Sequence, residues 1–335
     1  MRDLVRLPKA ELHVHLEGAV RVATLMELAD RYGRPLPSSL RDGRYSFVDF
    51  PDFLAQWLAV QDCLRGLEDL ERIAVEFCQD EARQGVRYAE AHVSLAEHAV
   101  VIGEWEACLE AVLSGFDRGR RESGVECAVI VDVVRGIDMA LSERATRTAV
   151  AFAGRGVVAM GLGGSELFAP EPYADFFDEA RRGGLHTVAH AGETGGPESI
   201  RAALDALRAE RLGHGIRILE DERLAAEVRD RGVPLEVCPT SNVMTGQVGS
   251  LQEHPLPALL EKGLTVTLNS DDPAMFGSFL ANEYEQARSA FGLSDESLAS
   301  IALAGVGVSF ADATTKAALE REIQLWLDQP PPEGA

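Results

Sequence analysis

Eight short runs of apolar and β-branched residues recur along the chain, and longer charged stretches with helical spacing separate most of them. Strands that alternate with helices in this way pair in parallel, because each helix carries the chain back across the sheet. Eight such units are the number that closes into a barrel, so the sequence predicts an α/β fold of the (β/α)8 TIM-barrel type. The predicted strands are 10–14, 86–93, 126–134, 157–162, 186–191, 211–214, 234–237 and 264–269.

The chain is predicted to form one barrel domain over residues 1–335. A length of 335 residues with 46% hydrophobic content is enough to bury a single large core. About seventy residues separate the first two predicted strands, which is more than one crossover needs. We therefore expect a helical insertion over 17–82 that caps the barrel mouth, and extra C-terminal helices over 278–328.

Charge and cysteine content exclude several classes of protein. The formal net charge of −22 repels phosphate backbones and anionic lipid headgroups, so neither nucleic acid nor membrane is an expected partner. Five scattered cysteines without a CxxC spacing argue against a disulfide framework and against a cysteine-based zinc site. No apolar run of membrane-spanning length occurs, and we predict a cytoplasmic location.

The first predicted strand ends in His13-Val14-His15. Because side chains alternate between the two faces of a strand, both imidazoles point the same way, into the barrel mouth. Two imidazoles at this spacing are a metal-binding pattern, although a lone HxH also occurs as two polar residues that end an ordinary strand. The other strand ends decide between these interpretations.

Histidine and carboxylate side chains also follow three later strands. His190 ends the fifth, His214 ends the sixth, and Asp271 and Asp272 follow the eighth. Catalytic groups of parallel barrels lie at the C-terminal ends of the strands, so these residues are expected to meet. Imidazoles plus one carboxylate suit zinc and leave a position for water. The predicted ligands of one zinc ion per chain are His13, His15, His190 and Asp271.

Glu193 and His214 are the predicted acid and base. Zinc lowers the pKa of a bound water to about 7, and His214 is placed to help that water attack an electron-poor carbon. Glu193 lies three residues after His190, in a turn that allows it to protonate the substrate, for which its pKa must be raised. A solvated loop carboxylate is the alternative for Glu193, and a turn or capping residue is the alternative for Asp272.

These motifs together resemble the adenosine deaminase family of metal-dependent amidohydrolases. The resemblance covers essentially the whole chain and rests on segments in the order and spacing of the family. They are LPKAELHVHLEGA (7–19), MGLGGSE (160–166), VAHAGETGGPESI (188–200), ERLGHGIRI (210–218), LEVCPTSNV (235–243) and VTLNSDDPAMFG (266–277).

The resemblance implies hydrolytic removal of the 6-amino group of an adenine nucleoside, with zinc on the four predicted ligands. It implies that Glu193 protonates purine N1, that His214 polarises the attacking water and that Asp272 contacts N7. It also implies that the backbone of Gly164 reaches N3. Residues at the positions of Glu17 and His15 contact the substrate in this family.

Two departures from the family pattern concern the substrate. Glu17 stands where many adenosine-specific members have aspartate, and His92 stands where arginine is commoner. His92 is interpreted either as a residue that shapes a wider pocket or as a structural histidine. His98, His186 and His254 are assigned to structure or surface.

The substrate alternatives are adenosine, a 5′-modified nucleoside such as aminodeoxyfutalosine, and adenine. The stretches after His190 and around Gly164 favour a nucleoside. A different amidohydrolase reaction and a non-catalytic nucleoside-binding paralogue are the other classes. The second would have lost a ligand or the acid, and none is missing in this sequence.

Overall fold

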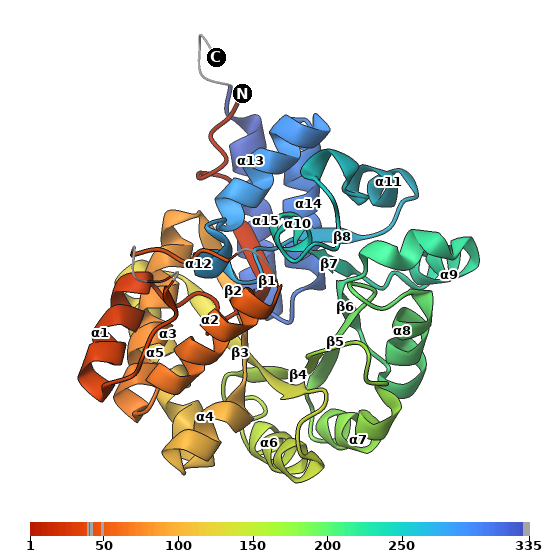
Figure 1. Ribbon diagram of the computed structural model, residues 1–335. Coiled ribbons are helices and arrows are strands. Elements are labelled where there is room, and N and C mark those ends of the chain that lie inside the picture. The colour runs from red at the N-terminus through yellow and green to blue at the C-terminus, as the bar shows by residue number, and fades with distance from the viewer. Residues whose placement is uncertain (39, 41–42, 48–49, 331–335) are drawn as a thin grey trace.

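A closed ring of parallel strands forms the centre of the molecule (Figure 1). The computed structural model describes residues 1–38, 40, 43–47 and 50–330, and within them eight strands pair in chain order. Backbone hydrogen bonds from His15 to Asp271 and from Asp271 to His13, 2.7 and 3.1 Å long, join the last strand to the first. The predicted barrel is confirmed. The strands are β1 Lys9–His15, β2 Val86–Val93, β3 Glu126–Val134, β4 Val157–Gly163, β5 His186–Ala191, β6 Arg211–His214, β7 Leu235–Val237 and β8 Val266–Leu268.

Four strands have the predicted bounds, and β8 is shorter than predicted at both ends. It stops before Asn269 because the side chain of this residue takes over the pairing with β1. Asn269 Oδ1 accepts the backbone N–H groups of Leu12 and His13 at 3.0 and 3.2 Å. The amide thus continues the β1–β8 seam beyond the strand, toward the residues that follow it.

Helices form an outer layer around the strands (Figure 1). They pack their apolar faces on the strands and leave their charged faces to solvent. None of the helices in the described ranges is long and apolar enough to span a bilayer. The helices are α1 Val22–Tyr32, α2 Phe50–Cys63, α3 Leu67–Arg83, α4 Leu95–Ile102, α5 Trp105–Ser123, α6 Met139–Ala151, α7 Ala174–Arg182, α8 Pro197–Ala202, α9 Glu222–Arg231, α10 Pro239–Met244, α11 Leu256–Glu261, α12 Pro273–Phe276, α13 Leu280–Phe291, α14 Asp295–Val308 and α15 Ala313–Asp328.

The predicted insertion 17–82 is helical in its described part, and only some of it is extra to the barrel. α3 packs against α5 and β2, which makes it the regular crossover helix between β1 and β2. α1 and α2 are the additional helices. On α2, the Trp57 ring lies edge-on to His15 at 5.7 Å, and Phe53 stacks on Phe276 at 5.4 Å between centroids. α2 therefore covers part of the mouth where β1 and β8 end.

The C-terminal helices complete the outer layer. α14 packs on β1 and β8 and fills the position of the eighth barrel helix. Side-chain caps fix where these helices start: Ser294 accepts the N–H of Ser297, and Asp312 accepts those of Thr314 and Thr315. The predicted C-terminal helical segment agrees with α13 to α15.

Three charged residues, named here the Arg211 cluster, bridge the barrel interior below the mouth. Arg211 on β6 is 1% exposed and donates to Glu90 of β2 and Glu236 of β7, each at 2.5 Å. Its third contact is the carbonyl of Val308, and Glu90 also accepts the N–H of Phe310. Buried charges are tolerated when they are paired and hydrogen-bonded in this way.

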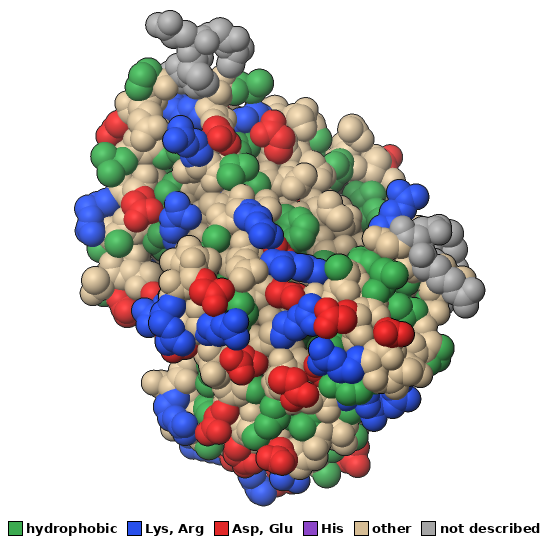
Figure 2. Space-filling view, turned by 90° about the vertical axis from the view of Figure 1, so that its left-hand side faces the viewer, with side chains coloured by type: hydrophobic (Ala, Val, Ile, Leu, Met, Phe, Trp, Pro, Cys, Tyr) green, Lys and Arg blue, Asp and Glu red, His purple; other side chains and the backbone are tan. Residues whose placement is uncertain are grey.

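The molecular surface carries both signs of charge. On the face drawn in Figure 2, Lys and Arg side chains are interspersed with Asp and Glu instead of forming a block of either sign. The five cysteines inside the molecule are free thiols.

Candidate active site

Three imidazoles and a carboxylate, named here the histidine cluster, meet at the C-terminal ends of β1, β5 and β8. His15 Nε2 lies 3.3 Å from His190 Nε2 and 3.3 Å from Asp271 Oδ1. His13 Nε2 lies 3.5 Å from the same carboxylate oxygen. The four residues predicted to bind metal are therefore brought together.

Contacts of the other ring nitrogens turn Nε2 atoms toward the centre of the cluster. His13 Nδ1 bonds Glu236 Oε2 at 2.9 Å, and His190 Nδ1 lies 3.2 Å from the carbonyl of Leu162. His13 is fully buried, and its Nε2 has no hydrogen-bond partner among the described residues. Such outer contacts orient metal-ligating histidines and fix their tautomer. An orphaned, inward-facing Nε2 is what a metal ion would satisfy.

The electrostatic field of the cluster favours a cation. Burial alone would lower the pKa of His13, but the neighbouring carboxylates of Asp271 and Glu236 raise it to about 10. For His15, the effect of burial is again outweighed, mainly by Asp271, Asp272 and Asp132, and its pKa rises to about 9. A site that stabilises positive charge on two buried imidazoles also stabilises a divalent ion, and nitrogen donors with one carboxylate suit zinc.

His214 lies beside the histidine cluster. Together with His13, His190 and Asp271 it offers donor atoms that all lie within 4.8 Å of one another. Its Nε2 is 3.6 Å from Glu193 Oε2 and 3.9 Å from Asp271 Oδ2. Burial lowers the pKa of His214 to about 4, so the ring is neutral near pH 7.

His214 and Asp271 reach the mouth through an unusual backbone conformation. Gly213 faces the barrel interior, since a Cβ there would meet His13 Cε1 at 2.6 Å, and the next side chain on a regular strand would point outward. A φ of 61° turns His214 inward instead, and Asp271 has a φ of 64°. Left-handed backbone is uncommon outside glycine and gathers at functional sites.

Glu193 lies in the turn after β5, and its position depends on a second carboxylate. Glu166 accepts the backbone N–H groups of Gly192, Glu193 and Thr194 at 2.8 to 2.9 Å. Burial, followed by the charges of Asp271 and Glu166, raises the pKa of Glu193 to about 8. The raised pKa required of an acid is thus present, which favours the catalytic interpretation of Glu193 over a solvated loop carboxylate.

Asp272 and Gly164 occupy opposite sides of the mouth. Asp272 Oδ1 is buried without a partner among the described residues, and its side chain forms no capping bond to α12. Gly164, after β4, has a φ of 80°, and a Cβ there would lie 2.9 Å from Val134 Cγ1. A side chain would be both strained and crowded at this position.

Glu17 differs from the expectation of a simple substrate contact. It is fully buried, and its Oε1 accepts from His98 Nε2 at 2.7 Å and from the backbone N–H of Ser94 at 2.9 Å. Only Oε2 has no partner among the described residues. His98, assigned to structure by sequence, thus orients Glu17.

The remaining histidines have structural partners. His92 is 1% exposed and bonds Asp132 at 2.8 Å, while its Nε2 has no partner among the described residues. His254 lies 3.2 Å from Asn242 Oδ1, and His186 bonds Glu210 at the surface.

Several supporting residues were not identified from the sequence. Glu236 orients His13, Asp132 holds His92 and lies near His15, and the amide of Asn242 lies 3.1 Å from His214 Nδ1. Glu236 and Asp132 stand within apolar strand runs. A carboxylate there must be buried and paired, which is a signal that could have identified them.

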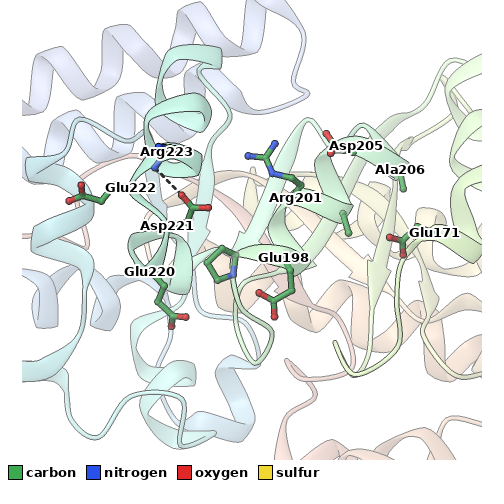
Figure 3. A pocket seen from close by; sticks show the side chains of 11 residues that line it. Glu171, Glu198, Arg201, Asp205, Ala206, Glu220, Asp221, Glu222 and Arg223 are labelled. Carbon is green, nitrogen blue, oxygen red and sulfur yellow. Dashed lines mark hydrogen bonds between the residues drawn. The ribbon is translucent and has the colours of Figure 1, made fainter.

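A wide hollow on the surface lies away from this chemistry. It has a volume of about 1070 Å³ and is lined from α8, the short helix η4 (Ile216–Glu220) and α9 by exposed charged side chains, among them Glu198, Arg201 and Glu222 (Figure 3). No histidine contributes to it. We therefore place the active site at the histidine cluster.

A parallel eight-stranded barrel with buried histidine and aspartate donors where its strands end defines a metal-binding hydrolase of the barrel type. The model of the family described as "Adenosine deaminase" matches residues 8–326. The chain belongs to this family.

Individual relatives cover nearly the whole chain. It is 39% identical to the aminodeoxyfutalosine deaminase of Streptomyces coelicolor over 96% of this chain and 84% of the relative. The crystal structure of adenine deaminase from Arthrobacter aurescens matches with a TM-score of 0.90 and 32% identity, over 96% of this chain and 99% of that one. An amidohydrolase structure from Burkholderia ambifaria with bound zinc matches with a TM-score of 0.88 and 28% identity, over 97% and 93% of the two chains. The protein is thus a purine deaminase with a buried metal site.

Proposed function

We propose that this protein hydrolyses the 6-amino group of an adenine nucleoside, adenosine or a 5′-modified relative, to the 6-oxo product and ammonia. One observation carries the proposal. A half-buried glutamate with a raised pKa, Glu193, lies 3.6 Å from a neutral His214 and beside the histidine cluster, in which His13 Nε2 has no partner among the described residues. Glu193 as the acid is thus paired with His214 and a metal-type site, which together would activate a water molecule.

His13, His15, His190 and Asp271 would hold one zinc ion per chain. When bound, zinc lowers the pKa of a coordinated water to about 7 and so supplies the nucleophile. Ser241 donates to Asp271 Oδ2 at 2.6 Å, and Glu236 orients His13. These bonds keep the donor atoms fixed while the reaction proceeds.

The residues around the cluster act on the purine ring. Glu193 transfers its proton to N1, which makes C6 more electron-poor, and His214 orients the attacking water through Nε2. Asp272 Oδ1 contacts N7, and the backbone of Gly164 approaches N3. The unpartnered Oε2 of Glu17 is left for the sugar. The attacking water gives up both of its protons: one reaches the 6-amino group, which then leaves C6 as ammonia, and the other restores the proton on Glu193.

One 5′-modified nucleoside and one substrate outside the nucleosides have specific support. Aminodeoxyfutalosine is favoured by the 39% identity to the Streptomyces coelicolor enzyme, and adenine by the likeness to the Arthrobacter aurescens structure. Both keep the residues that act on the purine ring in the same roles, but adenine has no sugar for Glu17 to contact.

The test is a turnover screen of the zinc-loaded protein with adenine, adenosine, 2′-deoxyadenosine, 5′-methylthioadenosine and aminodeoxyfutalosine. Ammonia release and the mass of the 6-oxo product are measured together. We expect a nucleoside to have the highest kcat/KM. A preference for adenine would replace the proposed substrate class, and no ammonia from any compound would contradict deamination.

A further inference from the structure

An apolar groove lies between α2, α4 and the start of α6, on the β1–β3 side of the mouth. Its volume is about 330 Å³. Two of its aliphatic side chains, Leu58 and Val100, are 56% and 60% exposed. Apolar surface that remains in contact with water favours a ligand that covers it. The aliphatic wall consists of Leu58, Val100, Val101, Ile137 and Leu141.

The same groove contains polar atoms that the protein leaves unsatisfied. Gln61 lines it and is only 9% exposed, yet neither its Oε1 nor its Nε2 has a partner among the described residues. Glu97 also lines the groove, and its Oε2 is buried without a partner in the same part of the chain. Buried polar atoms in native proteins are nearly always hydrogen-bonded, so these atoms indicate a polar ligand.

Both polar residues are connected to the active site. Gln61 follows Trp57 by one helical turn, and the Trp57 ring meets His15. Glu97 precedes His98, whose Nε2 bonds Glu17, two residues beyond His15. The groove therefore borders, through α2 and α4, on residues that contact His15 and Glu17.

In the proposed orientation of the purine, the sugar on N9 lies on the β1–β3 side of the mouth. Contacts at N1, N3 and N7 would come from Glu193 after β5, Gly164 after β4 and Asp272 after β8. On the perimeter of a purine, N9 lies between N3 and N7, on the side away from N1. In the strand ring, the arc from β4 to β8 that avoids β5 runs through β3, β2 and β1. The sugar on N9 thus points toward the groove.

We propose that this groove is a subsite for the 5′ substituent of an adenine nucleoside, and that it accepts an uncharged substituent with an apolar part and a hydrogen-bonding part. The inference rests on the proposed function. Charge argues against an anionic substituent, because Glu97 and Asp62 line the groove and Glu17 is near. The nearby cations Arg34 and Arg65 are engaged by Asp62. Burial also raises the pKa of Glu97 to about 7, which gives it a proton to donate.

The experiment uses two adenosine analogues that differ in charge. 5′-(N-ethylcarboxamido)adenosine carries a neutral amide and an ethyl group, and adenosine-5′-carboxylate carries an anion. We measure kcat/KM of the zinc-loaded protein for both, and for adenine, which lacks the sugar. We expect the amide to exceed the carboxylate by at least about tenfold, the scale of one hydrogen bond or one unfavourable charge. Equal values would overturn the proposal.

Variants of the wall separate binding from structure. Gln61→Leu and Val100→Glu are each expected to lower kcat/KM for the amide by about tenfold and to leave adenine unchanged. Gln252→Leu, at an exposed glutamine outside the groove, is the matched control. An equal loss for adenine would mean that the groove supports the fold only, and would overturn the proposal.

Failure of the proposed function can be distinguished from failure of the subsite. If no purine is deaminated, binding of the amide analogue is measured by calorimetry with the same proteins. Binding that Gln61→Leu weakens would support the subsite without the reaction. Binding that the variant leaves unchanged, or no binding at all, would overturn the subsite.

Discussion

Two buried polar clusters lie one above the other in the barrel, joined by the contact of Glu236 with His13, yet they differ in how many of their polar atoms have a partner. In the Arg211 cluster, the guanidinium and both carboxylates have close partners. In the histidine cluster, His13 Nε2 has none among the described residues, and imidazole nitrogens of His15 and His190 face each other at 3.3 Å. The lower cluster is complete as protein, whereas the upper one needs a ligand.

In a buried polar network, polar atoms without a partner mark the part that binds a ligand. Both clusters are charged and buried, so neither property distinguishes them. What distinguishes them is whether each donor and acceptor atom has a hydrogen-bond partner. The lower cluster holds Glu236 in place, and Glu236 orients His13 through a 2.9 Å hydrogen bond.

The largest effect is expected where a donor atom is removed from the upper cluster. His190→Ala deletes an inward-facing Nε2 and should abolish both zinc binding and deamination, since the proposed site needs each ligand. Zinc content by atomic spectroscopy and ammonia release measure the two. His186→Ala, at an exposed position on the same strand, is the control and should keep both. Full zinc content in His190→Ala would contradict the conclusion that the upper cluster needs a metal ion to satisfy its donor atoms.

Replacement of the proposed acid should come next. Glu193→Gln keeps the size of the side chain but cannot give a proton to the purine, and should lower kcat by about 10²- to 10⁴-fold. Zinc content and unfolding temperature should stay unchanged. Glu198→Gln, an exposed glutamate in the following helix, is the control. Turnover close to that of the control would remove Glu193 from the acid role.

Substitution of Glu236, which joins the two clusters, tests whether the lower cluster orients the upper one. Glu236→Gln weakens the bond that orients His13 and should lower zinc affinity by about 10- to 100-fold. Glu90→Gln removes a carboxylate from the same Arg211 without touching a histidine, so it should reduce stability and spare zinc affinity. Chelator competition measures the affinity. If both variants lose zinc equally, the lower cluster acts through charge balance and not through orientation.

The smallest expected effect is a pH dependence. Glu193 must be protonated to act, and its pKa of about 8 means that the acid form is lost as pH rises through that value. We expect kcat/KM to fall about fivefold from pH 8 to pH 9, because about half of Glu193 is protonated at pH 8 and about a tenth at pH 9. A stopped-assay profile from pH 6 to 10 checks this, and a flat alkaline limb with chemistry rate-limiting would contradict the assignment.

Much of the barrel and of the upper cluster could be predicted from the sequence. The strands are visible because apolar runs repeat with helical stretches between them, and His13, His190 and Asp271 are visible because metal-binding residue types stand where these runs end. Each of these signals is local. The fold rules of a parallel barrel then bring the strand ends together.

The supporting contacts could not be predicted, because they depend on partners far apart in the chain. Glu17 bonds His98, 81 residues away, so its burial is invisible to a local motif. The inward turn of His214 depends on its backbone dihedral and not on its residue type. Likewise, α3 has the amphipathic pattern of any surface helix, and only its contact with α5 separates it from the inserted α1 and α2.

The seam between β1 and β8 has a consequence for how the protein matures. Asp271 closes the strand ring through its backbone, with bonds to His13 and His15, and offers its carboxylate to the metal-type site. Ion binding and closure of the ring therefore depend on the same residue. Amide hydrogen exchange at the seam should accelerate when the ion is withdrawn by a chelator, while β4, which carries none of the four proposed ligands, exchanges as before. We therefore expect the metal-free protein to open at this seam before it opens elsewhere in the barrel.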